Sequence, residues 1–287
     1  MTGAAPGFLE RTVSAQDGLA LSYRHYGDAG SAKTPLLCLA GLTRNAKDFH
    51  ELALRYAPER RVLAMDYRGR GRSAYDPDWR NYRPPVYIRD ITHLLAAENV
   101  HRVIVLGTSL GGILAMALAV ALPAALAAVV LNDIGPEIDG AGIARIKGYV
   151  GQETALGDWE TATRRLKELF GVAYPDLPEA RWRALARVHF REDADGRPAL
   201  DYDPAIRRVL ENDAAGADMW PLFGALAEVP TLVIRGAISD ILSEATVAAM
   251  AAAKPDLVSL SVANRGHAPL LDEPECLAAL DDFIARH

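Results

Sequence analysis

The feature that most constrains this chain is a glycine-rich turn at Gly107–Gly112, Gly-Thr-Ser-Leu-Gly-Gly, which lies between two apolar runs. The run before it, Val103–Leu106, is short and rich in β-branched residues, which predicts a buried strand. The run after it, Ile113–Leu122, is rich in Ala and Leu and long enough for a helix. A Gly-x-Ser-x-Gly turn between strand and helix is typical of a nucleophile elbow, whose strained backbone lifts the Ser109 hydroxyl into a cleft.

Glycine at positions 107 and 111 suits such a turn, because a side chain there would collide as strand and helix fold back on each other. On its own, the pattern also fits a flexible turn. A serine hydroxyl is a poor nucleophile at neutral pH. The nucleophilic interpretation therefore requires a histidine base, a carboxylate that orients it, and an oxyanion hole.

Strand-like and helix-like segments alternate along most of the chain, after a predicted hairpin over residues 11–15 and 20–26. The expected strands are 36–40, 61–66, 103–106, 126–132, 231–235 and 257–262. The expected helices are 46–56, 84–98, 113–122, 243–253 and one that begins at 273. This alternation predicts an α/β fold with a mostly parallel sheet and helices on both faces.

The alternation breaks between residues 135 and 226, where amphipathic helical stretches such as Ile138–Val150 and Trp159–Phe170 replace it. We therefore expect a core formed by residues 1–134 and 227–287. We expect residues 135–226 to form a helical cap or lid, inserted after the sixth strand and lying over the cleft.

His267 is the best placed of the seven histidines to act as the base. It lies in a loop between the last expected strand and the last expected helix. Loops at the carboxyl ends of parallel strands face one crevice, so this loop can reach Ser109. The other histidines lie on expected helices, on edge segments or at the C-terminus, and a packing or surface role is expected for each: His25, His50, His93, His101, His189 and His287.

Two aspartates could supply the carboxylate, which in this kind of fold lies between the serine and the histidine in chain order. Asp240 follows the strand at 231–235 by a short loop, and Asp133 comes directly after the strand at 126–132. We favour Asp240, and expect Asp240→Asn to lower kcat by orders of magnitude through the wrong tautomer of His267. The other role open to Asp133 is at the cap hinge, where it would bind backbone amides or line the cleft.

The oxyanion hole requires two backbone N–H groups aimed at the position where negative charge develops. One is expected from Leu110, the residue after the nucleophile. The other is expected from Leu42, in the loop after the strand at 36–40, where Gly41 permits a sharp turn.

Together these segments resemble the α/β-hydrolase superfamily, and the resemblance covers nearly all of the chain except the cap. The matching segments are, in order, Ala40–Leu42, Asp66–Ser73, Gly107–Gly111, Arg235–Asp240 and Gly266–His267. The resemblance implies a capped, serine esterase-like enzyme, in which the Asp66–Ser73 loop has a structural role. The family usually has His-Gly where this chain has Ala40 before its glycine, a difference that affects support of the oxyanion hole more than the hole itself.

Serine at the elbow implies acyl chemistry, because the dehalogenases and epoxide hydrolases of the superfamily carry aspartate there. The expected function is that of a carboxylesterase-like hydrolase: Ser109 attacks an ester, and water then hydrolyses the acyl-enzyme. Hydrolysis of C–C bonds in ring-cleavage products, or of lactones, is the alternative. A catalytically silent, ligand-binding relative is a further alternative from a different class.

The cap is expected to determine which substrate binds. Its apolar residues predict either a lining of the cleft or packing within the cap: Ile138, Ile143, Ile146, Tyr149, Val150, Trp220, Leu222 and Phe223. No basic cluster marks a carboxylate pocket, although Arg145, Lys147 and Arg191 could each supply a charge. Small to medium, largely uncharged esters are therefore the favoured substrates.

Composition argues against other classes of partner. A net charge of −6 disfavours nucleic acid as a partner. The uncharged stretch from 103 to 132 is long enough for a membrane span, but the glycines and Pro123 that interrupt it favour buried strands and a helix. No metal-ligand cluster or phosphate-binding loop is present, so no metal or cofactor is expected. Cys38 and Cys276 predict buried free thiols and a cytoplasmic location.

Overall fold

The short apolar segments of the chain form the buried centre of one sheet in the computed structural model, which describes residues 7–152, 156–212 and 218–287. Every residue of the third, fourth and sixth strands is buried, as expected for parallel strands that helices cover on both faces. The strands are β1 Leu9–Ser14, β2 Ala20–Tyr26, β3 Leu36–Leu39, β4 Val62–Met65, β5 Val103–Thr108, β6 Leu126–Asn132, β7 Phe190–Glu192, β8 Pro198–Leu200, β9 Thr231–Gly236 and β10 Val258–Val262.

Eight of these strands form the main sheet, in the order β1-β2-β4-β3-β5-β6-β9-β10. The β1–β2 hairpin is antiparallel and pairs antiparallel with β4, whereas every later pairing is parallel. The expectation of a mostly parallel sheet is confirmed. The carboxyl ends of β3, β5, β6, β9 and β10 therefore meet at one edge, where the loops that follow them can form a site.

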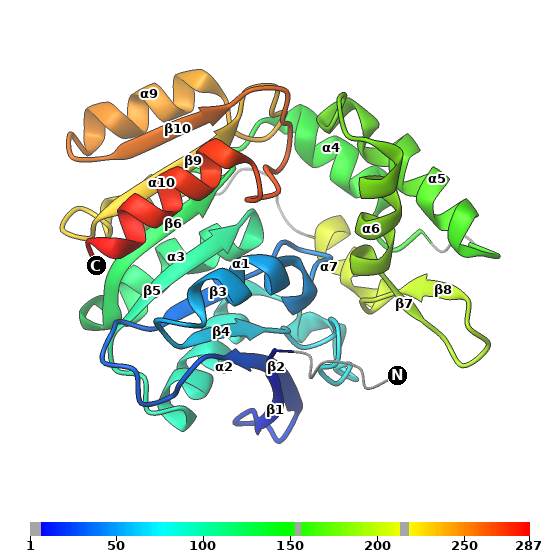
Figure 1. Ribbon diagram of the computed structural model, residues 1–287, viewed down its shortest axis with the longest axis horizontal. Coiled ribbons are helices and arrows are strands. Elements are labelled where there is room, and N and C mark those ends of the chain that lie inside the picture. The colour runs from blue at the N-terminus through cyan, green and yellow to red at the C-terminus, as the bar shows by residue number, and fades with distance from the viewer. Residues whose placement is uncertain (1–6, 153–155, 213–217) are drawn as a thin grey trace.

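Helices cover both faces of this sheet (Figure 1). One hydrophobic cluster lies between the sheet and α2, α3, α8 and α9, and a second lies between the opposite face and α1 and α10. The α-helices are α1 His50–Tyr56, α2 Pro84–Ala97, α3 Leu110–Ala121, α4 Gly140–Tyr149, α5 Trp159–Phe170, α6 Glu179–His189, α7 Arg207–Asn212, α8 Trp220–Gly224, α9 Glu244–Ala253 and α10 Pro274–Ala285. The expected helix at 46–56 is divided into a 3₁₀ turn, Ala46–Phe49, and α1.

A helical layer lies beyond the carboxyl ends of the central strands, and it holds α4 to α7 and the β7–β8 hairpin (Figure 1). It has a hydrophobic core of its own, in which Trp182 and Leu166 are buried. The structure thus places a helical cap after the sixth strand. The limits of 135 and 226 stay a prediction, and α8 within them packs on the sheet side, where Phe223 is buried in the core cluster.

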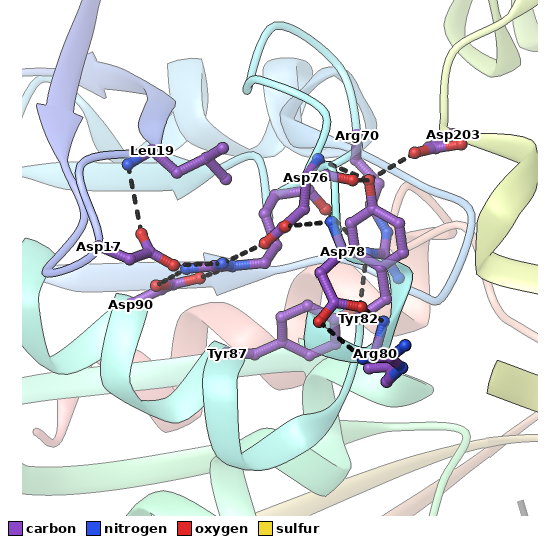
Figure 2. A network of polar contacts seen from close by, with 11 residues as sticks. Asp17, Leu19, Arg70, Asp76, Asp78, Arg80, Tyr82, Tyr87, Asp90 and Asp203 are labelled. Atoms are coloured by element: carbon purple, nitrogen blue, oxygen red, sulfur yellow. Dashed lines mark hydrogen bonds and ion pairs between the residues drawn. The ribbon is translucent and has the colours of Figure 1, made fainter.

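The loop after β4 ties this cap to the core. The Tyr82 hydroxyl donates a hydrogen bond of 2.5 Å to Oδ2 of Asp203, which lies in the cap (Figure 2). Two backbone bonds run beside it, from Asp203 N to Gly69 O at 2.8 Å and from Gly71 N to Asp201 O at 2.9 Å. One side of the cap is therefore fixed to the core by both main-chain and side-chain bonds. None of the described helices has the length and apolar character needed to cross a membrane.

Candidate active site

Ser109 lies at the turn between β5 and α3, with φ 54° and ψ −117°. A positive φ is uncommon for a residue other than glycine, and such strain is concentrated at functional sites. The Ser109 N–H donates to the carbonyl oxygen of Asn132, at the end of the neighbouring strand β6, at 3.0 Å. This bond holds the turn against the sheet.

The glycines on either side of this turn are required by close backbone contacts. A Cβ at Gly107 would lie 2.3 Å from the carbonyl carbon of Gly111, and one at Gly111 would lie 2.0 Å from the carbonyl oxygen of Leu39. Atoms cannot approach so closely, so a side chain at either position would push α3 away from β5 or β3. The sequence-based reason for these glycines is therefore confirmed.

A chain of hydrogen bonds begins at Ser109. Its Oγ lies 2.8 Å from Nε2 of His267, and Nδ1 of His267 lies 2.7 Å from Oδ2 of Asp133. His267 lies in the loop between β10 and α10, so three loops at one edge of the sheet supply the three side chains. The Asp133 side chain has no exposed surface, and that of His267 is 10% exposed.

Asp133 is held by two donors in addition to His267. The Gly236 N–H donates to its Oδ1 at 2.8 Å, and the Ser239 hydroxyl donates to its Oδ2 at 2.6 Å. These bonds satisfy a buried carboxylate that has no Lys or Arg partner among the described residues, and charged acceptors make strong bonds. Asp133 itself adopts a φ of 55°, directly after β6.

The prediction that Asp240 orients His267 is wrong in this structure. Its carboxylate turns toward the cap, where Nε and Nη2 of Arg145 donate to it at 2.5 and 2.8 Å. The reason is local: after β9 the chain turns so that Ser239 points into the site and Asp240, the next residue, points away from it. Asp133, the weaker candidate from the sequence, contacts the imidazole instead.

The loop after β3 lies against the serine, as expected. A Cβ at Gly41 would lie 3.7 Å from Cβ of Ser109. Among the described residues, no group accepts a hydrogen bond from the N–H of Leu42 or of Leu110. Their role as oxyanion donors stays a prediction, and the position of the loop agrees with it.

Two buried side chains from the loop after β4 hold this segment in place. Nε of Arg70 donates to the carbonyl oxygen of Leu42 at 2.9 Å, and the Tyr67 hydroxyl donates to that of Ala40 at 3.1 Å. Arg70 is completely buried and also donates to the Tyr87 hydroxyl at 2.6 Å. The Asp66–Ser73 segment therefore supports the loop after β3, which agrees with the structural role that the resemblance implies. Tyr67 and Arg70 provide this support although Ala40 replaces the usual histidine.

A cavity of about 270 Å³ lies beside Ser109 and His267, between the core and the cap. A smaller cavity of about 60 Å³, deeper in the cap, adjoins it. The two cavities share five lining residues: Thr43, Arg44, Tyr149, Phe170 and His189.

Within the described part of the chain, each lysine or arginine that lines the larger cavity is paired with a carboxylate. The pairs are Arg44–Asp48, Lys47–Asp201 and Arg181–Asp272. Neither cavity is lined by Arg145, Lys147 or Arg191, the cap residues considered as sources of charge. Charge in the cavity is therefore largely compensated by the protein itself.

The two roles that the sequence left open overlap in the cap. Ile146 and Tyr149 line the larger cavity and also pack against the core cluster, whereas the following pack against or within that cluster and do not line the larger cavity: Ile138, Val150, Trp220, Leu222 and Phe223. His189, for which a packing or surface role was expected, lines both cavities. A single histidine at the end of an amphipathic helix carries no sequence signal that separates these roles.

Among the described residues, no group of three or more His, Cys, Asp or Glu could hold a metal ion.

Comparison with a family model and with known proteins adds to this geometry. Residues 36–280 match the model described as "Alpha/beta hydrolase family". The chain is 34% identical over 273 residues to a protein of Cupriavidus necator named 3-hydroxybutyrate-oligomer hydrolase, and the match covers 92% of each chain. It is 25% identical over 250 residues to a 2-(acetamidomethylene)succinate hydrolase of Mesorhizobium japonicum, covering 87% of each.

Among solved structures, the chain resembles the crystal structure of an α/β hydrolase from Novosphingobium aromaticivorans. The two share 45% sequence identity with a TM-score of 0.94, and the match covers 99% of this chain and 100% of the other. Both the core and the cap region therefore have a counterpart in that protein.

Proposed function

The chain belongs to the α/β-hydrolase family, and we propose that it hydrolyses carboxylic esters with Ser109 as the nucleophile. His267 is the base in this proposal, and Asp133 orients its imidazole. The observation that carries the proposal is the continuous pair of hydrogen bonds, 2.8 Å and 2.7 Å long, that joins these three side chains.

The reaction follows from the geometry. Nε2 of His267 takes the proton of the Ser109 hydroxyl while Oγ attacks the ester carbonyl carbon. The imidazolium then gives this proton to the leaving alkoxide, and an alcohol departs from the acyl-enzyme. Water repeats the sequence with His267 as base and releases the acid. The N–H groups of Leu42 and Leu110 bind the tetrahedral oxyanion, and loss of one such donor costs roughly 3 kcal/mol in the transition state.

Small to medium, largely uncharged esters fit the cavity in this proposal, because its lysine and arginine side chains are already paired. The relative from Cupriavidus necator is named for 3-hydroxybutyrate oligomers, so esters of hydroxy acids are the first substrates to test. The relative from Mesorhizobium japonicum is named for a substrate that carries an amide and no ester, so relatives of this chain are not confined to esters. Hydrolysis of C–C bonds or of lactones remains the alternative reaction.

Covalent labelling with a fluorophosphonate tests the nucleophile. We expect the wild-type protein to gain one adduct on the peptide that contains Ser109, and Ser109→Ala to gain none. Ser259→Ala is the matched control, since that serine is exposed on β10, and it should be labelled like the wild type. A folded wild-type protein that forms no adduct would instead support the ligand-binding alternative.

A substrate comparison tests the reaction. Initial rates on short p-nitrophenyl esters, on a lactone and on a dienoate ring-cleavage product should be highest for the esters. Much faster turnover of the dienoate or the lactone would contradict the ester hydrolase proposal, although Ser109 would keep its role.

A further inference from the structure

Three aromatic rings from three different cap helices line the wall that the two cavities share. Tyr149 is the last residue of α4, Phe170 of α5 and His189 of α6. These three helices lie in the cap (Figure 1). The Phe170 ring lies edge-on to Tyr149 with the ring centroids 5.4 Å apart, and its centroid is 5.7 Å from that of His189. Phe170 therefore contacts both of the other rings, and each of those rings carries a polar atom.

The hydrogen bond made by His189 fixes which of its ring nitrogens carries the proton. Nδ1 lies 3.0 Å from the carbonyl oxygen of Leu185, one helical turn earlier. A carbonyl oxygen only accepts hydrogen bonds, so Nδ1 is the protonated nitrogen. Burial, together with the nearby Arg44 guanidinium, lowers the pKa of His189 well below its ordinary value, so the ring is neutral. Nε2 is then an acceptor.

Within the described part of the chain, no group donates a hydrogen bond to Nε2 of His189. In the same part, no group accepts one from the hydroxyl of Tyr149. Burial raises the pKa of Tyr149 to about 12, so its hydroxyl keeps its proton and can donate. Arg44, which lines both cavities beside these groups, is paired with Asp48. The cavity wall thus presents one uncharged acceptor and one uncharged donor without partners, and both flank an apolar ring.

A hydroxyl group matches this pair, because it donates one hydrogen bond and accepts another. We propose that His189 determines specificity in the ester hydrolysis proposed above, by accepting a hydrogen bond from a hydroxyl group of the substrate, with Tyr149 as its donor partner. A substrate without that hydroxyl leaves both polar groups without their substrate partner in the cavity, and this costs binding in the transition state. The inference rests on the proposed function.

Two pairs of esters test the proposal and locate the hydroxyl. Ethyl 3-hydroxybutyrate against ethyl butyrate examines the acyl side, and 2-hydroxyethyl butyrate against propyl butyrate examines the alcohol side. The measured quantity is the ratio of kcat/KM values within each pair, followed by titration of the released acid. For the wild-type protein we expect the hydroxylated ester to be preferred by about tenfold or more in one pair.

His189→Leu should lower that ratio to about 1, since it removes the acceptor and leaves Ser109 and His267 in place. His189→Asn keeps a side-chain oxygen that accepts and should retain part of the preference. Tyr149→Phe, which changes little in volume, should lower the ratio as well, and it tests the proposal even if His189→Leu fails to fold. His101→Leu is the matched control, because that histidine is exposed and far along the chain from the cap.

The outcomes separate this proposal from the proposed function. If the wild-type protein hydrolyses both members of each pair equally, or if the variants lower both rates by the same factor, His189 has only a packing role and the proposal is overturned. If the wild-type protein hydrolyses no ester, the proposed function fails and this proposal fails with it.

Discussion

Asp133 and Asp240 follow neighbouring parallel strands, β6 and β9, yet they belong to different environments. Asp133 is fully buried and accepts from a backbone N–H, a serine hydroxyl and the His267 imidazole. Asp240 is 36% exposed and is held by Arg145 of the cap. Their comparison shows that the donors around a carboxylate, more than the strand it follows, decide which aspartate serves the imidazole.

The two aspartates also differ in the charge of the groups that bind them. Burial opposes ionisation of Asp240, but the hydrogen bonds and charge of Arg145 outweigh it and hold the pKa of Asp240 below its usual value. The carboxylate of Asp240 is therefore already paired with a positive charge, and its hydrogen bonds attach α4 to the core. Apart from His267, the groups that bind Asp133 are uncharged, so the negative charge of Asp133 is available to stabilise the imidazolium.

Asp133→Asn should give the largest effect. An asparagine amide would present its N–H₂ or its oxygen to Nδ1 without a charge, and it would favour the wrong tautomer of His267. We expect kcat for ester hydrolysis to fall by about 10⁴-fold at neutral pH. Steady-state rates measured with a p-nitrophenyl ester check this.

The fold of that variant is the necessary control, and fluorophosphonate labelling at long incubation together with circular dichroism provides it. A well-folded Asp133→Asn protein that keeps kcat within about tenfold of the wild type would show that Asp133 does not orient the base.

Ser239→Asp in an Asp133→Ala background asks whether the loop after β9 can supply the carboxylate. The Ser239 hydroxyl already contacts the Asp133 oxygen that binds His267. An aspartate at this position extends toward the space that Asp133→Ala vacates. We expect kcat to rise about tenfold or more above that of Asp133→Ala alone. Equal rates for the two variants would mean that only the end of β6 can place the carboxylate.

Much of the fold followed from the sequence, because the signals were periodic and local. The apolar runs gave β3 to β6, β9 and β10 within one or two residues, and helix α5 matched Trp159–Phe170 at both ends. The pairing of Ser109 with His267 was predictable, because Ser109 lies two residues from a glycine on either side and His267 directly follows Gly266, each in a loop after a strand. Close backbone packing at such a turn requires glycine, and the glycines can be recognised in the sequence.

The sequence carries no comparable signal for which aspartate supplies the carboxylate. Both candidates are aspartates after apolar strands, and a one-residue difference in where a loop turns decides between Ser239 and Asp240. The role of the cap residues was similarly hidden, because helical spacing is the same for residues that face a cavity and residues that face the core. His189 and Phe223 illustrate the two results.

Asp240→Asn should give the smallest effect, and it reverses the expectation from the sequence. The Asp240–Arg145 pair is partly exposed, with side chains 36% and 30% accessible, so its loss should lower the free energy of unfolding by less than ~1 kcal/mol. Because no hydrogen bond within the described residues joins this pair to Ser109, His267 or Asp133, kcat should stay within about twofold of the wild type. Arg145→Met is the matched variant, and it should behave alike if the pair acts only as a link between α4 and the core. A fall of kcat by orders of magnitude in Asp240→Asn, with Asp133→Asn active, would exchange the roles of the two aspartates.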